Sequence, residues 1–210
     1  MTAGRTAFPP VGFDRLLLVV TGALAAAFVP QGLAWLRTTY PDLAVRVVLT
    51  RAAERFVSPS ALGVVSGNPI EPDTWPDAPV TAAPHVVLAE WAQAIVVYPA
   101  TVHYVSRLAL GLADTPSLLA LQCTRAPVAV APAFPPGGWD NPLLRRHVTA
   151  LEERPNIAVV PPAPARSWTT GRDDAYGAAP FPAVLGTVEL RRRALAGHAP
   201  DLGGEDGEDS

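Results

Sequence analysis

Two stretches of the sequence place small and hydroxylated residues directly after strand-like runs. Residues 96–98 form an apolar run that ends at Pro99, and an apolar spacing typical of a helix begins shortly afterwards. The junction, residues 99–103 (Pro-Ala-Thr-Val-His), therefore lies at the carboxyl end of a predicted strand and the amino end of a predicted helix. In α/β proteins this position commonly binds ligands, phosphate groups in particular. The sequence thus predicts a ligand site at this junction.

A second junction of the same kind follows the predicted strand over residues 15–20. Thr21 and Gly22 come directly after it, and a run rich in alanine follows. The stretch lacks the full G-x-G-x-x-G pattern, so it gives little support to dinucleotide binding. A threonine hydroxyl and backbone amides at a helix start can bind a phosphate. The alternative is a tight strand-to-helix turn that binds nothing.

The elements that must position these junctions alternate along the chain. Strands are predicted at residues 15–20, 44–50, 94–99, 119–123, 127–133 and 156–162. Helices are predicted at residues 28–40, 51–57, 85–92, 104–113 and 141–154, and a turn-rich loop at 66–85. The strands are continuous apolar runs, as expected for a parallel sheet buried on both faces. We therefore predict an α/β fold: a Rossmann-like, doubly wound parallel sheet in three αβα layers.

Length and composition predict how this fold occupies the chain. The 210 residues suit one domain, which we place at residues 14–194 after an N-terminal extension over 1–13. Residues 195–210 are acidic and rich in glycine, and we expect this tail to be disordered. A net charge of −3 argues against nucleic acid or an anionic membrane as a partner. The apolar run over 16–29 is too short for a membrane span. The single cysteine, Cys123, excludes an internal disulfide and suits a reducing cytoplasm.

An ordered set of motifs over residues 15–172 resembles the homo-oligomeric flavin-containing cysteine decarboxylases. This family includes phosphopantothenoylcysteine decarboxylase and the epidermin-type peptidyl-cysteine decarboxylases of lanthipeptide pathways. The similar stretches are RVVLTRAAERFVSP (46–59), SGNPI (66–70), PHVVLAEWA (84–92), YPATVHYVSRLALGLADT (98–115) and APAFPPGGWDNPLLRRH (131–147). They occur in the family's order, and the last two stand where its Pro-Ala-Ser-Ala-Asn-Thr and Pro-x-Met-Asn-x-x-Met-Trp motifs belong.

The resemblance implies a flavin, FMN or FAD, bound between the subunits of a trimer that often assembles further into a dodecamer. It places Thr21, Gly22 and Ala23 near the flavin phosphate and Thr50 near the cofactor. It also places four residues beside the isoalloxazine ring: Pro99, Ala100, Thr101 and His103. His85 corresponds to the family's active-site histidine, and an imidazole exchanges protons near neutral pH, as a general base must. Apart from the family, His85 is a helix-start histidine with local hydrogen bonds only.

The sequence departs from the family at two asparagines. His103 replaces the asparagine of the first motif, and Pro135 replaces the asparagine that binds the substrate carboxylate in the second. A proline cannot donate a hydrogen bond, so another group must bind that carboxylate. His103 and Arg172 are the candidates, and a guanidinium matches a carboxylate with two parallel hydrogen bonds. The alternative is a flavin-binding regulatory subunit without catalytic activity.

The segment over residues 161–177 distinguishes the subfamilies. It lacks the cysteine of phosphopantothenoylcysteine decarboxylase, and Cys123 lies in a predicted core strand, where it would be buried and inert. SWTTGR (167–172) instead resembles the substrate-clamping loop of the epidermin-type enzymes, in which Trp168 and Arg172 would bind the peptide end; an ordinary surface loop is the alternative. We therefore expect oxidative decarboxylation of the C-terminal cysteine of a ribosomal precursor peptide to an enethiol. The alternative enzyme is similar to phosphopantothenoylcysteine decarboxylase.

Overall fold

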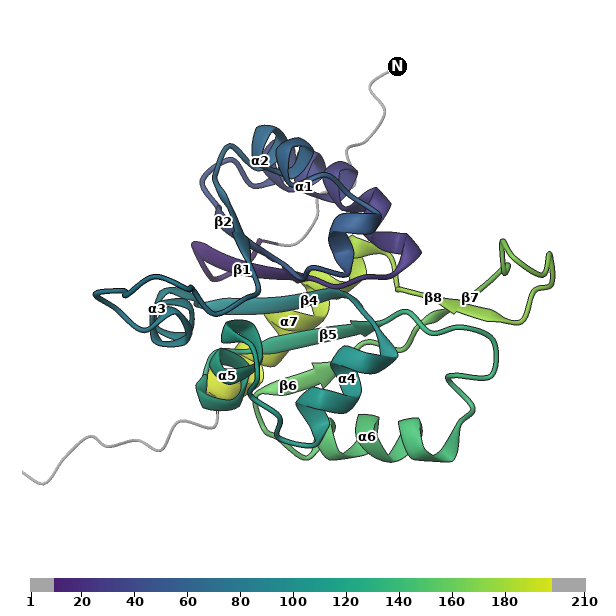
Figure 1. Cartoon of the computed structure of the whole chain (residues 1–210). Coiled ribbons are helices and arrows are strands. Elements are labelled where there is room, and N and C mark those ends of the chain that lie inside the picture. Colours follow the sequence, from purple (N-terminus) through teal and green to yellow (C-terminus); the bar gives the residue numbers. More distant parts are fainter. Residues whose placement is uncertain (1–9, 198–210) are drawn as a thin grey trace, which may run out of the picture.

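The computed structural model describes residues 10–197, and its centre is a six-stranded parallel sheet in the order β3-β2-β1-β4-β5-β6 (Figure 1). The strands are β1 (Arg15–Val20), β2 (Ala44–Leu49), β3 (Ile70–Pro72), β4 (Ala94–Ala100), β5 (Val128–Pro132) and β6 (Ile157–Val159). The central strand β1 pairs with β2 on one side and with β4 on the other. The chain therefore reverses its winding direction between β1 and β4, where doubly wound sheets commonly bind ligands.

Helices cover both faces of the sheet. The sheet residues that alternate along β1 divide between two apolar clusters, with Leu16 and Leu18 in one and Leu17 and Val19 in the other. The first face carries α1 (Val29–Thr39), α2 (Pro59–Ser66) and α7 (Phe181–Gly197). The second face carries α3 (Pro84–Trp91), α4 (Val102–Ala109), α5 (Pro116–Cys123) and α6 (Pro142–Glu152). This arrangement confirms the predicted three-layer, Rossmann-like α/β fold.

Short elements connect these layers. Two 3₁₀ helices follow β1 and β2, namely η1 (Leu24–Phe28) and η2 (Ala53–Arg55). A separate antiparallel hairpin, β7 (Ala163–Ala165) with β8 (Ala175–Gly177), projects beyond the carboxyl end of β5 (Figure 1). Within residues 10–197 no helix has both the length and the apolar character needed to cross a membrane.

Two predicted elements are wrong in kind or in length. Residues 119–123 were predicted as a strand, but they belong to helix α5. Pro116 begins that helix, in agreement with the preference of proline for the first helical turn. The helix predicted over 104–113 ends at Ala109, because Gly111 adopts a left-handed φ of 75°.

Several elements were not predicted, among them η1 and the hairpin β7–β8. The short edge strand β3 lies within the stretch expected to be a loop, and α2 follows the predicted helix over 51–57, of which η2 is the helical part. Helix α7 is another, and it continues to Gly197, beyond the predicted domain end at residue 194. At the other end Phe13 is buried in the core, although the N-terminal extension was expected to include it. The rest of that extension and of the acidic tail, residues 1–9 and 198–210, lies outside the described residues.

Candidate functional site

A pocket of about 640 Å³ opens at the carboxyl ends of the central strands. Its wall combines the segment after β1, the start of α4, the loop after β5 and the hairpin β7–β8. The predicted site residues that line it are Gly22, Ala23, Thr101, His103, Pro135 and Trp168. Six of the twelve residues predicted from the sequence, which come from four separate segments, therefore meet in one cavity. The structure places the remaining six beneath the pocket or outside it.

Gly22 forms a backbone cradle at one end of this pocket. A Cβ atom built on Gly22 would lie 2.6 Å from the Cβ of Ala52 and 2.7 Å from its carbonyl oxygen. Only glycine fits there, because η2 and its preceding turn pack directly against the segment after β1. The following residue, Ala23, caps η1 without a side-chain hydrogen bond, and no acidic residue lies in the first turn. The N–H of Ala23 itself donates to the carbonyl of Thr21 at 2.9 Å, so the amides that could bind an anionic group such as a phosphate are the first ones of η1, which have no intrahelical partner.

Thr50 supplies a second observation at this end. Its Oγ1 atom is buried and has no hydrogen-bond partner among the described residues. A buried hydroxyl without a partner is costly, and an oxygen atom of a bound ligand would satisfy it. Its backbone N–H donates to Val20 at 3.0 Å, so Thr50 lies beside the end of β1. The glycine cradle and this hydroxyl together fit the phosphate or ribityl end of a flavin.

Thr21 has a different position from the one expected. Its side chain is 1% exposed, and its hydroxyl donates to the carbonyl of Pro99 at 2.6 Å while accepting from the N–H of Thr101 at 2.9 Å. The residue therefore joins the ends of β1 and β4 from beneath the pocket. Pro99 and Ala100 are buried as well, so these three residues support Thr101, which lines the pocket, rather than line it themselves.

His103 stands at the start of α4 and faces the pocket from its exposed side. Thr101 caps this helix by accepting a hydrogen bond from the N–H of Tyr104 at 3.2 Å. One turn further on, Arg107 Nη1 lies 3.4 Å from His103 Nε2. A guanidinium only donates hydrogen bonds, so the contact requires Nε2 to be the acceptor and the proton to be on Nδ1. Arg107 also pairs with Asp114, and this hydrogen bond lowers the pKa of the Asp114 carboxyl below its ordinary value.

The opposite wall of the pocket is aromatic. Phe134 exchanges backbone hydrogen bonds with Tyr176, at 2.9 and 3.3 Å, and so attaches the hairpin to the loop after β5. The ring of Trp139 contacts both of them, with centroid distances of 6.0 Å to Phe134 and 6.4 Å to Tyr176. The guanidinium of Arg145 covers the ring of Trp139 at 4.6 Å. These contacts fix the base of the hairpin, while Trp168 near its tip is 82% exposed.

Arg172 does not line the pocket. Its Nε donates to Asp174 at 2.8 Å, and both residues belong to the exposed loop between β7 and β8. Arg166, the first residue of the same loop, does line the pocket. Pro135 lies in the wall as well, and it offers no donor to a substrate carboxylate there.

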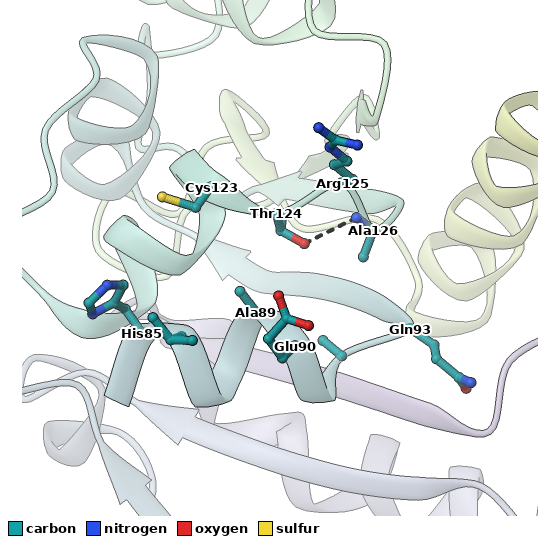
Figure 2. A pocket seen from close by; sticks show the side chains of 10 residues that line it. His85, Ala89, Glu90, Gln93, Cys123, Thr124, Arg125 and Ala126 are labelled. Atoms are coloured by element: carbon teal, nitrogen blue, oxygen red, sulfur yellow. Dashed lines mark hydrogen bonds between the residues drawn. The ribbon is translucent and has the colours of Figure 1, made fainter. Parts of the chain in front are cut away.

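His85 lies in a different cavity, a groove of about 500 Å³ between α3 and the end of α5 (Figure 2). It is at the first turn of α3, and its ring packs edge-on against Trp75 at 5.8 Å. Its Nδ1 atom is buried and has no partner among the described residues. Figure 2 shows that Cys123 extends from the opposite side of this groove, above His85. Within one copy of the chain, His85 and the pocket with His103 are thus separate sites.

Cys123 corrects the expectation of a buried, inert thiol. It is exposed, because residues 119–123 form the last turn of α5 rather than a core strand. The helix directs its last residue into the groove, whereas Leu118 and Leu121 face the core.

A chain of contacts connects the two sites. Trp75, which packs on His85, donates its indole N–H to the carbonyl of Asp114 at 2.8 Å. Asp114 pairs with Arg107, which contacts His103. Below them, the buried hydroxyls of Tyr104 and Ser117 lie 2.7 Å apart, and Ser117 donates to Asp73 at 2.8 Å. The loop that carries Trp75 is thereby held against α4 and α5.

Several residues of the pocket wall were not predicted. Leu24 and Phe28 of η1 are exposed apolar residues that line it, and Arg166 does so from the hairpin. In η1, Leu24 and Phe28 are exposed and Ala26 between them is buried. The alanine-rich sequence of this stretch does not reveal that pattern. The hairpin strands contain three residues each, too few for a recognisable alternation.

Comparison with known proteins gives a consistent result. The Flavoprotein family matches residues 12–187. A curated protein of Streptomyces sp., cypemycin cysteine dehydrogenase (decarboxylating), is 37% identical over 142 residues, which cover 68% of this chain and 73% of that protein. The coenzyme A biosynthesis bifunctional protein CoaBC of Haemophilus influenzae is 33% identical over 142 residues, which cover 67% of this chain but only 34% of that protein.

Solved structures show the same relationship. The crystal structure of the cypemycin decarboxylase CypD superimposes with a TM-score of 0.74 at 31% identity, covering 91% of this chain and 99% of that one. The FMN-dependent cysteine decarboxylase SpaF superimposes with a TM-score of 0.72 at 27% identity, covering 85% and 97%.

Proposed function

Because this chain belongs to the flavoprotein family, we propose that it oxidatively decarboxylates the C-terminal cysteine of a ribosomally made precursor peptide. The product is an enethiol, the precursor of an aminovinyl-cysteine ring in lanthipeptide-type biosynthesis. The observation that carries the proposal is the pocket at the strand ends, one wall of which is formed by the hairpin β7–β8. It occurs in a chain that is 37% identical to a cysteine dehydrogenase. The single cysteine supports a cytoplasmic location.

FMN is the cofactor that we propose, because the similar cysteine decarboxylase SpaF is FMN-dependent. The cradle at Gly22 and Ala23 would hold its phosphate, and the unpartnered hydroxyl of Thr50 would contact the same end of the cofactor. Thr101 and His103 would lie beside its ring system. When bound, FMN supplies a two-electron acceptor, which no protein side chain provides.

The reaction balances as a two-electron oxidation followed by loss of carbon dioxide. Removal of two hydrogens from the cysteine side chain gives a thioaldehyde, and the bond to the carboxylate carbon then breaks as CO₂ leaves. The electron pair of that bond moves onto the thioaldehyde and yields the enethiol. We assign to His85 the removal of the thiol proton, because it stands at the position of the family's active-site histidine and an imidazole can act as a general base.

This assignment requires more than one copy of the chain, since His85 and the pocket are separate within one copy. We propose a homo-oligomer, a trimer that can assemble into a dodecamer, in which His85 of one copy faces the pocket of the next. Four exposed apolar residues near His85 support an interface at this face: Trp75, Val80, Val86 and Val87. A heterologous contact of this kind closes into a ring.

Phosphopantothenoylcysteine decarboxylation is the second candidate, favoured by the 33% identity to a coenzyme A biosynthesis protein. Two features favour the peptide reaction instead. The loop over residues 166–174 contains no cysteine, and the exposed ring of Trp168 lines the pocket, where a peptide side chain can pack on it. A non-catalytic flavin-binding subunit is the remaining alternative.

The test measures the flavin absorbance of the protein and the mass of the peptide after incubation with it. The purified protein should show oxidised-flavin absorbance, and incubation with a cysteine-ended peptide should remove the mass of CO₂ and two hydrogens. Amidation of the same peptide should abolish the reaction, because no CO₂ can then leave. A colourless protein that takes up no added FMN contradicts the proposal. Turnover of phosphopantothenoylcysteine, but of no peptide, selects the second candidate.

A further inference from the structure

We propose that Arg166 is the residue that binds the C-terminal carboxylate of the peptide substrate. The inference rests on the proposed function. Arg166 takes the carboxylate-binding role that an asparagine has in the family, where this chain has Pro135, and that we expected Arg172 to have. It assigns specificity for a free peptide terminus to the first residue of the loop between β7 and β8.

The first argument is the inventory of donors in the pocket wall. Arg166 is the only arginine or lysine among the described residues that line the pocket. His103, the other candidate, already uses one ring nitrogen in its contact with Arg107 and has a single N–H left to donate. A guanidinium presents two parallel N–H groups that match both oxygens of a carboxylate. Arg166 alone offers that geometry in this cavity.

The second argument is the state of the two loop arginines. Arg172 donates to Asp174 at 2.8 Å, so its side chain is held outside the pocket. Arg166 has only a loose ion pair, with 3.8 Å between its Nη1 and Asp173 Oδ2. That distance is too long for a hydrogen bond, and no hydrogen bond among residues 10–197 involves the Arg166 guanidinium. Both members of the pair are exposed, so the pair contributes little and is readily exchanged for a ligand.

The third argument is position relative to the phosphate cradle. Gly22 and Ala23 form one end of the pocket through the segment after β1, whereas Arg166 enters from the hairpin together with Trp168. Aromatic residues of the loop after β5 fix the base of that hairpin. A peptide end held by Arg166 therefore lies on the hairpin side of the pocket, and the flavin phosphate on the side of η1.

The experiment measures preference for a free carboxylate without relying on turnover. Flavin-loaded protein, reduced with dithionite and kept without oxygen so that no cysteine is oxidised, is immobilised and offered two pools of hexapeptides that end in cysteine. Five positions are randomised, and one pool consists of free acids and the other of amides. Mass spectrometry gives the ratio of captured acid to captured amide. We expect the wild type to favour the acid by about ten- to hundredfold, the range of a charged hydrogen bond.

The variants assign that preference to a residue. Arg166→Ala should bring the ratio close to one while retaining flavin, and Arg166→Lys should restore it only in part, since lysine lacks the planar fork. Arg146→Ala, on the exposed face of α6, removes the same charge and should keep the wild-type ratio. Arg172→Ala should also keep it, because its partner Asp174 lies outside the pocket.

Three results overturn the assignment: a wild type that does not distinguish acid from amide, a preference lost in Arg172→Ala but kept in Arg166→Ala, and loss of flavin from Arg166→Ala. The last would place Arg166 at the phosphate. A parallel assay for CO₂ loss by the wild type separates the two proposals. An acid preference that depends on Arg166, without CO₂ loss, supports this assignment and contradicts the proposed function. CO₂ loss by the wild type, together with an acid-to-amide ratio that Arg166→Ala leaves unchanged, supports the proposed function and contradicts the assignment of Arg166.

Discussion

At Gly22 the chain lacks a side chain because another backbone segment occupies the space that one would need. Gly22→Ala places a Cβ atom 2.6 Å from Ala52, so the turn before η2 must move. We expect loss of flavin from the purified protein and a free energy of unfolding lowered by about 1–3 kcal/mol, the usual cost of overpacking. The flavin-to-protein absorbance ratio and urea denaturation measure the two effects.

Gly186→Ala is the matched control for this prediction. A Cβ atom at Gly186 meets nothing within 4 Å, and the residue lies inside α7. Alanine there should retain the flavin and stabilise the protein by up to about 1 kcal/mol, the difference in helix propensity. A Gly22→Ala protein with full flavin occupancy would show that the cradle does not hold the cofactor.

Residue types at the strand ends were predictable, but their orientation was not. The apolar runs and the small residues that follow them locate Gly22, Thr101 and His103 in one pocket. Whether a hydroxyl faces the ligand or the neighbouring strand depends on the distance between β1 and β4, which the sequence does not contain. Thr21 faces the strand. The exposure of Cys123 likewise depends on whether the short apolar run over residues 119–123 forms a strand or a helix.

Among the elements, α7 depends most on a single charged residue. Glu189 is 3% exposed, and its carboxylate accepts hydrogen bonds from the N–H of Gly12 and from the side chains of Arg192 and Arg193. These bonds, that of Arg192 above all, lower the pKa of Glu189 to about 2 from an ordinary value of 4.5. The charged form is therefore the one that the fold stabilises, and it attaches the N-terminal segment to α7.

The contribution of Glu189 should be complete above pH 4.5 and disappear as the pH falls towards 2. We expect Glu189→Gln to lower the free energy of unfolding by about 2 kcal/mol at pH 7, the scale of hydrogen bonds to a charged group. At pH 3 the difference from the wild type should be much smaller. Urea denaturation at both pH values measures it, with the exposed Glu152→Gln as a control. An equal difference at pH 3 and pH 7 contradicts this account.

Elements with long periodic patterns were predicted well, and short ones were not. β1, β2, β4 and β5 are largely apolar runs rich in valine, leucine and alanine, and their bounds agree with the prediction to within two residues. The run at residues 119–123 is five residues long, a length at which a buried strand and a buried helix have the same pattern. Pro116, at the start of α5, was the signal for a helix. The hairpin β7–β8 could not be found by pattern, since the residue that Tyr176 pairs with outside the hairpin, Phe134, is about forty residues away along the chain.

At the scale of the whole molecule, the separation of His85 from the pocket makes a prediction about mixed assemblies. His85→Asn alone should keep its flavin and lose turnover by about a hundredfold, the usual contribution of a general base. Gly22→Ala alone should lack flavin but retain His85. Co-expressed, the two variants should form some sites with the pocket of the first and the histidine of the second.

Random mixing in a cyclic trimer makes about a quarter of the sites complete, so activity should return in the mixture. The assay compares CO₂ loss by the co-expressed variants with that of the same two proteins purified separately and kept at a concentration where subunits do not exchange. Activity absent from every mixture would show that each site is completed within one copy. The oligomer itself is measured by light scattering.

The attachment of the hairpin through Phe134 and Tyr176 has a consequence for how the enzyme can change. Among residues 10–197, its two short strands hydrogen-bond only to each other and, through Tyr176, to the loop after β5. Neither strand belongs to the six-stranded sheet. The loop over residues 167–174, which follows the proposed carboxylate-binding Arg166, can therefore vary in length and sequence without altering the sheet, the segment after β1 that carries Gly22, or the helix α3 that carries His85. Such a segment is open to transplantation: exchanging these eight residues should change which peptides bind, while Arg166, Gly22 and His85 stay in place.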